Sequence, residues 1–143
     1  EHIYNPELFL KKLYKKTSLN PDIKLLFSTP NVANIFIRLM LLFGNFNYGR
    51  RGILDKTHTR LFTKKTFYNI LDENNFEVVN QKYVPIPVPL IIKNKFISRI
   101  IMNILNFLNT WLGKLFAFQF IFLAKPRPSL DYLLLSGNNK NYL

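Results

Sequence analysis

The feature that most constrains the fold of this chain is a set of three short runs with strand character. Longer segments of helical periodicity separate these runs. Residues 23–28 and 116–124 are nearly continuous apolar runs, and residues 76–84 also have strand composition. Apolar runs of this length are typical of strands that are buried on both faces of a sheet. Helical patterns precede the first strand and separate all three, and this alternation predicts a layered α/β domain.

Helix-start signals fix where several of these helices begin. Asn5, followed by a proline and an acidic residue, is a favourable N-cap for the first helix. Asn31 is expected to cap a helix over residues 32–43 that Gly44 ends, because glycine favours helix termination. Thr63 is expected to cap a helix that runs to about residue 74.

The segment 96–112 is the strongest amphipathic helix in the sequence, and Gly113 is expected to end it. Its apolar face is predicted to contain Phe96, Ile97, Ile100, Ile101, Ile104, Leu105, Leu108, Trp111 and Leu112. Asparagines, Arg99 and Gly113-Lys114 interrupt the apolar stretch, so it is not expected to cross a membrane. Three interpretations remain: packing over the sheet, packing against a second subunit, or lying in a membrane interface.

Composition narrows the classes of protein. The chain has 143 residues, enough for one small domain, and it lacks cysteine, so a disulfide scaffold is excluded and a cytoplasmic location is the default. The net charge of +12 favours either an anionic partner or a general Lys-rich bias balanced elsewhere in a longer protein. Basic residues are scattered along the chain, which argues against nucleic acid and leaves peripheral membrane contact as the alternative.

Four motifs in order resemble one family. EHIYNPELFLKKL, LLFSTPNVANI, GILDKTHTRLFTKKTFYNILDENNFEVV, and VPIPVPLI followed by FAFQFIFLAKPRP together cover residues 1–128. They resemble the C-terminal half of a class I S-adenosylmethionine-dependent methyltransferase, in a subgroup often found among genes for glycan or metabolite assembly.

The resemblance implies a definite fold. The family's Rossmann-like sheet has the strand order 3-2-1-4-5-7-6, with strand 7 antiparallel, and residues 23–28, 76–84 and 116–124 correspond to strands 5, 6 and 7. Residues 1–128 would be a partial methyltransferase domain and residues 129–143 a tail. The Gly-rich loop and the acidic residue that hold S-adenosylmethionine in this family have no counterpart in the sequence, which predicts an incomplete half-domain.

Several residues are candidates for chemistry. His58, in a loop before a helix start, is the candidate base or substrate contact, with a hydrogen-bonding role in the loop as the alternative. Arg50, Arg51 and Arg60 are candidates for binding an anionic substrate, although solvated loop charges are the simpler explanation. Asn31 follows a strand end where such sheets place ligands, but helix capping already accounts for it.

Glu1 and His2 are assigned, by resemblance, to the edge of the cofactor pocket. In ubiquinone-pathway O-methyltransferases a similar Glu-His pair helps to hold a divalent cation together with an acidic residue further upstream. That acid has no counterpart in this sequence, so no metal site is predicted.

The expected function is methyl transfer from S-adenosylmethionine to a hydroxyl or amine of a small metabolite or sugar, performed by the intact protein. The first alternative is a non-catalytic assembly module that oligomerises through its open sheet edge and the 96–112 helix. The second is a peripheral membrane protein that uses the same helix and the positive charge.

Overall fold

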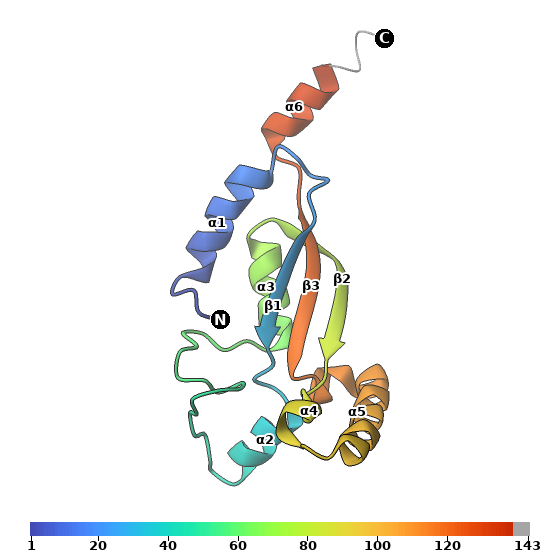
Figure 1. Ribbon diagram of the computed structural model, residues 1–143. Helices are drawn as coiled ribbons and strands as arrows, with labels where there is room; N and C mark the ends of the chain where they lie inside the picture. Colours follow the sequence, from blue (N-terminus) through green and yellow to red (C-terminus); the bar gives the residue numbers. More distant parts are fainter. Residues whose placement is uncertain (139–143) are drawn as a thin grey trace.

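The computed structural model describes residues 1–138, and residues 139–143 of the expected tail lie outside this range. In chain order the elements are α1 (Pro6–Thr17), β1 (Leu25–Pro30), α2 (Ile35–Leu42), α3 (Lys64–Glu73), β2 (Phe76–Val84), α4 (Val88–Ile91), α5 (Lys95–Phe116), β3 (Gln119–Pro126) and α6 (Leu130–Asn138) (Figure 1). The chain is therefore an α/β protein, as the alternation of strand and helix patterns predicts.

The strands form one sheet with the order β1-β3-β2. The last strand in sequence lies in the middle and is antiparallel to both neighbours, pairing Phe27 with Phe122 on one side and Phe76 with Pro126 on the other. The pairing between β2 and β3 has an irregularity between Val78 and Asn80, as a β-bulge would produce. β3, the central strand, has the longest apolar run of the three, from Phe120 to Ala124.

Helices α1 and α3 pack on one face of this sheet. The core beneath them joins Leu10, Phe62, Phe67, Ile70, Leu71, Phe76, Ala117, Phe120, Phe122 and Ala124. Burying each of the large side chains contributes about 1.5–3 kcal/mol. The aromatic rings meet edge to face, as Phe27 and Phe76 do with centroids 5.6 Å apart. This cluster is the main hydrophobic core of the described residues.

The expectation that the strands are buried on both faces is wrong within residues 1–138. Burial alternates strictly along β3, where Phe120, Phe122 and Ala124 are buried but Ile121 and Leu123 are only half-buried. On β1, Leu26 is 69% exposed. Successive side chains point to opposite faces of a strand, so a sheet covered on one side leaves every second apolar residue at the surface.

The strand and cap positions also need correction. The strand expected at 23–28 lies two residues later. The strand expected at 116–124 begins three residues later, because residues 116–118 end α5 and lead into β3. Asn5 and Thr63 cap their helices as predicted, Thr63 in a capping box with Thr66. Asn31 does not cap α2. Asn34 does so, accepting a hydrogen bond from the backbone N–H of Phe36 at 3.0 Å.

Helix α5 is longer than expected, and most of the apolar face predicted for it is exposed. It continues past Gly113 to Phe116, with a break at Leu112. Its buried residues are Ser98, Asn109 and Gly113, so it does not pack its apolar side over the sheet. Gly113 is required here because the Tyr83 ring would lie 2.6 Å from an added Cβ. We call Phe96, Ile97, Ile100, Ile104, Phe107 and Trp111 the outer face of α5, since all six are exposed.

The C-terminal end of α5, after the break at Leu112, is held by hydrogen bonds. The side-chain amides of Asn31 and Asn34 both donate to the carbonyl of Ala117, each at 2.9 Å, and they also reach the carbonyls of Lys114 and Phe116. Before the break, the side of the helix toward the protein is mixed, with half-buried Leu105 and Leu108 beside buried Asn109. None of the helices within residues 1–138 has both the length and the hydropathy that crossing a bilayer requires.

Candidate functional site

A cleft of about 290 Å³ opens where β1 ends and β3 begins. Its lining residues come from the N-terminal segment, the strand ends and the loop between α2 and α3: Glu1, His2, Pro30, Arg51, Gly52, Asp55, His58, Phe118 and Gln119. The carboxyl end of β1 is the edge at which open α/β sheets commonly bind ligands. Four residues proposed from the sequence, namely Glu1, His2, Arg51 and His58, therefore meet in one place.

The loop before α3 is held in a tight turn. The Gly49 N–H donates to the Leu54 carbonyl at 2.8 Å, and the Lys56 N–H donates back to the Gly49 carbonyl at 3.1 Å. Gly52, with φ of +96°, supplies a backbone conformation that other residues rarely adopt. The Asp55 carboxylate accepts two hydrogen bonds from Thr57, and these bonds lower the pKa of Asp55 below its ordinary value.

Thr59 attaches the N-terminal segment to this loop. Its N–H donates to the Glu1 carbonyl at 2.9 Å, and its hydroxyl donates to the carbonyls of Glu1 and Ile3 at 3.1 and 3.0 Å. These bonds bring Glu1 and His2 beside His58, across more than fifty residues of sequence.

His58 has a defined orientation. Its side chain is only 6% exposed, and its Nδ1 lies 3.0 Å from the Ile53 carbonyl oxygen. A carbonyl can only accept, so Nδ1 carries the proton in this bond, and Nε2 of the neutral ring has a free lone pair. Nε2 lies 3.6 Å from Oε1 of Glu1. The ring is thus fixed with its basic nitrogen toward a carboxylate.

His2 repeats this arrangement at the surface. Its Nδ1 lies 3.2 Å from the Thr57 carbonyl oxygen, and its Nε2 lies 3.8 Å from the same Glu1 oxygen. The two imidazole rings are 4.9 Å apart, centroid to centroid, and meet edge to face. Both histidines therefore direct their Nε2 atoms to one carboxylate.

This cluster is suited to two kinds of chemistry. His58 Nε2 can accept a proton from a hydroxyl or amine, and the nearby Glu1 carboxylate would stabilise the imidazolium that forms. The three side chains could also hold a divalent cation, since their ligand atoms lie within 4.8 Å of one another. Metal-binding histidines usually donate the other ring N–H to a carbonyl, as both do here.

The metal-compatible grouping was not expected from the sequence, where Glu1 and His2 lacked a third ligand. His58 supplies it, and no spacing rule connects residues so far apart. Oε2 of Glu1 is also buried without a hydrogen-bond partner in the described part of the chain. An unpartnered buried carboxylate oxygen is consistent with either a bound cation or a substrate donor at this position.

The remaining proposed residues lie outside the cleft. Arg60 pairs with Glu7 of α1, which lowers the pKa of Glu7, and its guanidinium lies over the Phe62 ring. Arg50 is exposed on the loop and does not line the cleft. Asn31 is fully buried, and its side chain is hydrogen-bonded to the backbone at Ala33, Lys114 and Ala117. It joins the end of β1 to the end of α5 and does not face the cleft.

Comparison with known proteins gives no assignment. No protein-family model matches the chain, and no curated protein matches it significantly. The cleft and the motifs of the sequence are the remaining indications of function.

Proposed function

We propose that this chain forms the acceptor side of a class I S-adenosylmethionine-dependent methyltransferase domain. In the intact protein, it would promote methyl transfer to a hydroxyl or amine of a small metabolite or sugar. The observation that carries the proposal is the convergence of Glu1, His2, Arg51 and His58 in one cleft at the carboxyl end of β1. These residues were selected from motifs that are distant in the sequence.

The strand arrangement supports the same proposal. The motif resemblance assigns β1, β2 and β3 to the family's strands 5, 6 and 7, and the family order places an antiparallel strand 7 between the other two. The sheet has this order and these directions. A three-stranded antiparallel sheet is common, so the agreement supports the assignment only together with the motifs.

In this proposal His58 removes the proton of the acceptor. An acceptor hydroxyl between His58 Nε2 and the Glu1 carboxylate would lose its proton as the methyl group arrives, which makes the oxygen a better nucleophile. Arg51, on the rim of the cleft, would bind an anionic group of the same acceptor. The loop bonds through Ile53 and Thr57 keep both imidazoles in place for this role.

In this proposal the described residues would not hold the cofactor by themselves. The family's Gly-rich loop, which would bring backbone N–H groups to the cofactor's methionine moiety, has no counterpart in this sequence. The unpaired edge of β1 is where the family's remaining strands would continue the sheet. S-adenosylmethionine would supply the methyl group, and residues of the intact protein beyond those described here would hold this cofactor.

The test is a methyl-transfer assay of the intact protein with isotopically labelled S-adenosylmethionine and a panel of hydroxyl and amine acceptors. His58→Ala should lower kcat by about 10²–10⁴-fold. Arg50→Ala is the matched control for Arg51→Ala, because the two arginines are adjacent and only Arg51 lines the cleft. Failure of the intact protein to transfer methyl groups would refute the function. Low-micromolar binding of S-adenosylmethionine to residues 1–143 alone would refute the half-domain interpretation.

A second candidate function is a non-catalytic assembly module. The observation that favours it is the uncovered face of the sheet, where Leu26 is exposed beside Ile121 and Leu123 around a shallow hollow of about 440 Å³. Self-association through this face or through the β1 edge would bury it. This candidate would be favoured if light scattering shows a stable dimer and if the intact protein self-associates but does not transfer methyl groups.

A further inference from the structure

The outer face of α5 is an unusual surface for a protein in water. Its six side chains, all isoleucine or aromatic, are between 45% and 75% exposed, with Trp111 and Phe96 the most exposed. Meanwhile the same helix buries a serine and an asparagine, and neither side-chain polar atom of Asn109 has a hydrogen-bond partner within residues 1–138. Apolar side chains gathered on one exposed helix face mark an interaction surface.

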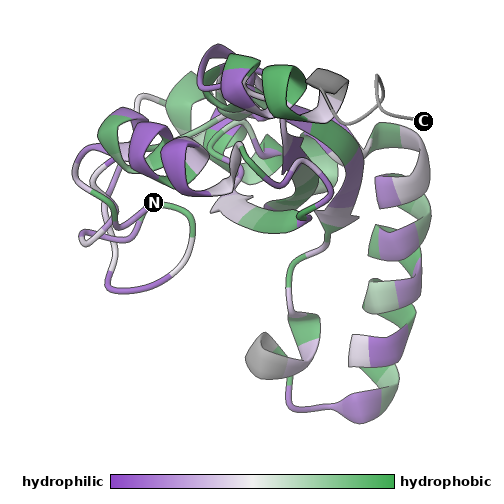
Figure 2. Ribbon diagram, turned by 90° about the horizontal axis from the view of Figure 1, so that it is seen from above, coloured by the Kyte–Doolittle hydropathy of each residue, from purple (hydrophilic) through white to green (hydrophobic). Residues whose placement is uncertain are grey.

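The outer face of α5 lies away from the sheet edge at which further strands would be added. In the order β1-β3-β2, α5 contacts β2, whereas the edge that the proposed missing strands would extend belongs to β1 on the opposite side. Figure 2 shows α5 projecting from the body of the molecule rather than lying on the sheet. Completing the sheet at β1 therefore leaves the outer face of α5 exposed.

The charges around α5 have one sign. Lys93 and Lys95 lie at its start, Arg99 follows one turn later, and Lys114 lies near its end; all four are exposed. The sequence has no acidic residue between Glu77 and Asp131. Lysine and arginine beside an apolar helix face can place their aliphatic stems on the apolar surface and their charges at lipid phosphates.

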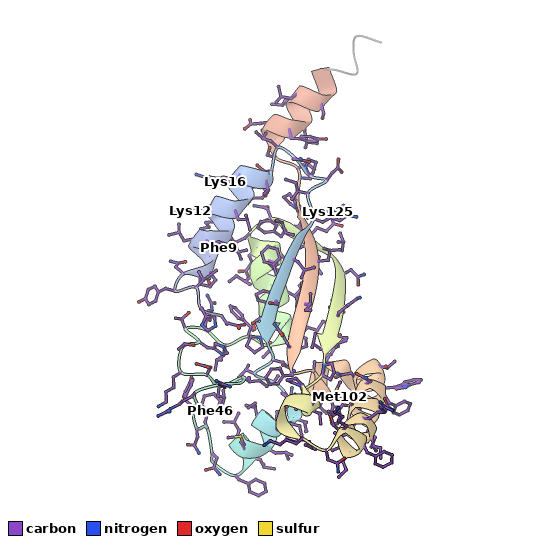
Figure 3. The ribbon with its side chains drawn as sticks, in the orientation of Figure 1. Phe9, Lys12, Lys16, Phe46, Met102 and Lys125 are labelled. Carbon is purple, nitrogen blue, oxygen red and sulfur yellow. The ribbon has the colours of Figure 1, made fainter. Side chains whose placement is uncertain are left out.

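Helix α2 adds a second apolar surface at the same end of the sheet (Figure 1). Phe36, Leu42 and Phe43 are each more than half exposed, and Arg38 is the only charged residue of the helix. The nearby loop contributes Phe46, which Figure 3 places at this end, away from Lys12 and Lys16 of α1. Exposed apolar side chains and cations thus lie together at this end of the molecule.

We propose that α5 docks on an anionic lipid bilayer, with its outer face inserted among the acyl chains and its cations at the headgroups. A second copy of the chain fits less well, because apposing two such helices would bring like charges together without acidic partners. The apolar face supplies affinity and the cations select for anionic lipid. The C-terminal end of α5, at Phe116, lies two residues before Phe118 of the cleft.

Trp111 makes the proposal directly measurable, since it is the only tryptophan in the chain. The full chain would be titrated with phosphatidylcholine vesicles that contain either phosphatidylserine or no anionic lipid, with tryptophan emission recorded. The expected result is a blue shift with the anionic vesicles and quenching by lipids that carry bromine on their acyl chains. The shift should be weaker with neutral vesicles and should decrease at high salt.

Two matched pairs of variants locate the contact. Phe107→Ser should weaken partitioning at least about tenfold, whereas Leu26→Ser, at an equally exposed apolar position on the sheet, should not. The double variant Lys93→Gln/Lys95→Gln should weaken it about 25-fold, at about fivefold per charge. Lys12→Gln/Lys16→Gln removes the same charge from α1 and should change partitioning by less than about threefold. All of these side chains are exposed, so the variants should fold.

Three results would overturn the proposal. The first is unchanged Trp111 emission with every vesicle composition at low salt. The second is full vesicle binding by Phe107→Ser and by Lys93→Gln/Lys95→Gln, which would place the contact elsewhere. The third is a stable dimer in light scattering with Trp111 protected before any lipid is added, which would make a second copy the occupant of this face.

Discussion

Helices α3 and α5 are both amphipathic, yet they use their apolar faces in opposite ways. Helix α3 buries Phe67, Ile70 and Leu71 against the sheet. Helix α5 buries Ser98, Asn109 and Gly113 and leaves its outer face in water. The comparison shows that periodicity predicts where an apolar stripe lies on a helix but not what covers it.

The largest expected effect compares the same truncation on the two helices. Ile70→Ala removes a side chain that is 4% exposed and should lower the free energy of unfolding by about 2–5 kcal/mol, because a cavity remains in the core. Ile104→Ala removes one that is 53% exposed and should change it by less than about 0.5 kcal/mol. Urea unfolding measures both. Equal losses would mean that the outer face of α5 is packed in solution.

The next effect concerns the contact that holds the C-terminal end of α5 against β2. Gly113→Ala places a methyl group against the Tyr83 ring and should destabilise the protein by about 1–3 kcal/mol. Gly44→Ala is the control for space, because nothing lies within 4 Å of an added Cβ there. Because the φ of Gly44 is +72°, any loss of stability in Gly44→Ala would come from backbone strain. If Tyr83→Ala does not relieve the loss in Gly113→Ala, the proposed contact is wrong.

Removing a helix cap costs about 1 kcal/mol, so cap variants compare α3 and α5 through a smaller effect. Thr63→Ala removes the capping box of α3 and should lower global stability by this amount, since α3 forms part of the core. Asn94→Ala removes the bonds to the N–H groups of Phe96 and Ile97 and should instead fray the start of α5. Hydrogen exchange resolves the two cases. Faster exchange throughout the sheet in Asn94→Ala would contradict the weak coupling of α5 to the core.

The smallest effect is a pH dependence on the α1–α3 side of the molecule. Arg60 lowers the folded-state pKa of Glu7 below 4.5, so the pair stabilises the fold at neutral pH. That stability should be lost as the pH falls through the lowered folded-state value. Glu7→Gln should remove this part of the acid sensitivity, as measured by urea midpoints at successive pH values. Helix α5 contains no acidic residue and should contribute none. An unchanged acid profile in Glu7→Gln would show that the pair is negligible.

Sequence patterns predicted the strands and the caps at Asn5 and Thr63 because these depend on local chemistry. They failed for Asn31 because α2 begins at Ile35, three residues later than expected, so that Asn34 is the cap. They also failed to predict that most of the apolar face of α5 is exposed. Within the cleft, Glu1, His2, Arg51 and His58 were recognisable from motifs, but the convergence of both Nε2 atoms on Glu1 depends on the Thr59 bonds, which periodicity does not encode.

The most direct test of the contrast between α3 and α5 is the accessibility of Trp111 in the absence of lipid. Acrylamide quenching of the monomeric chain should approach that of a free indole, because this side chain is 75% exposed. The emission should be that of a hydrated ring. A blue-shifted emission that resists quenching in a monodisperse monomer would show that the outer face of α5 is already covered by the chain itself. It would contradict both the opposite use of the two helices and the lipid-docking surface.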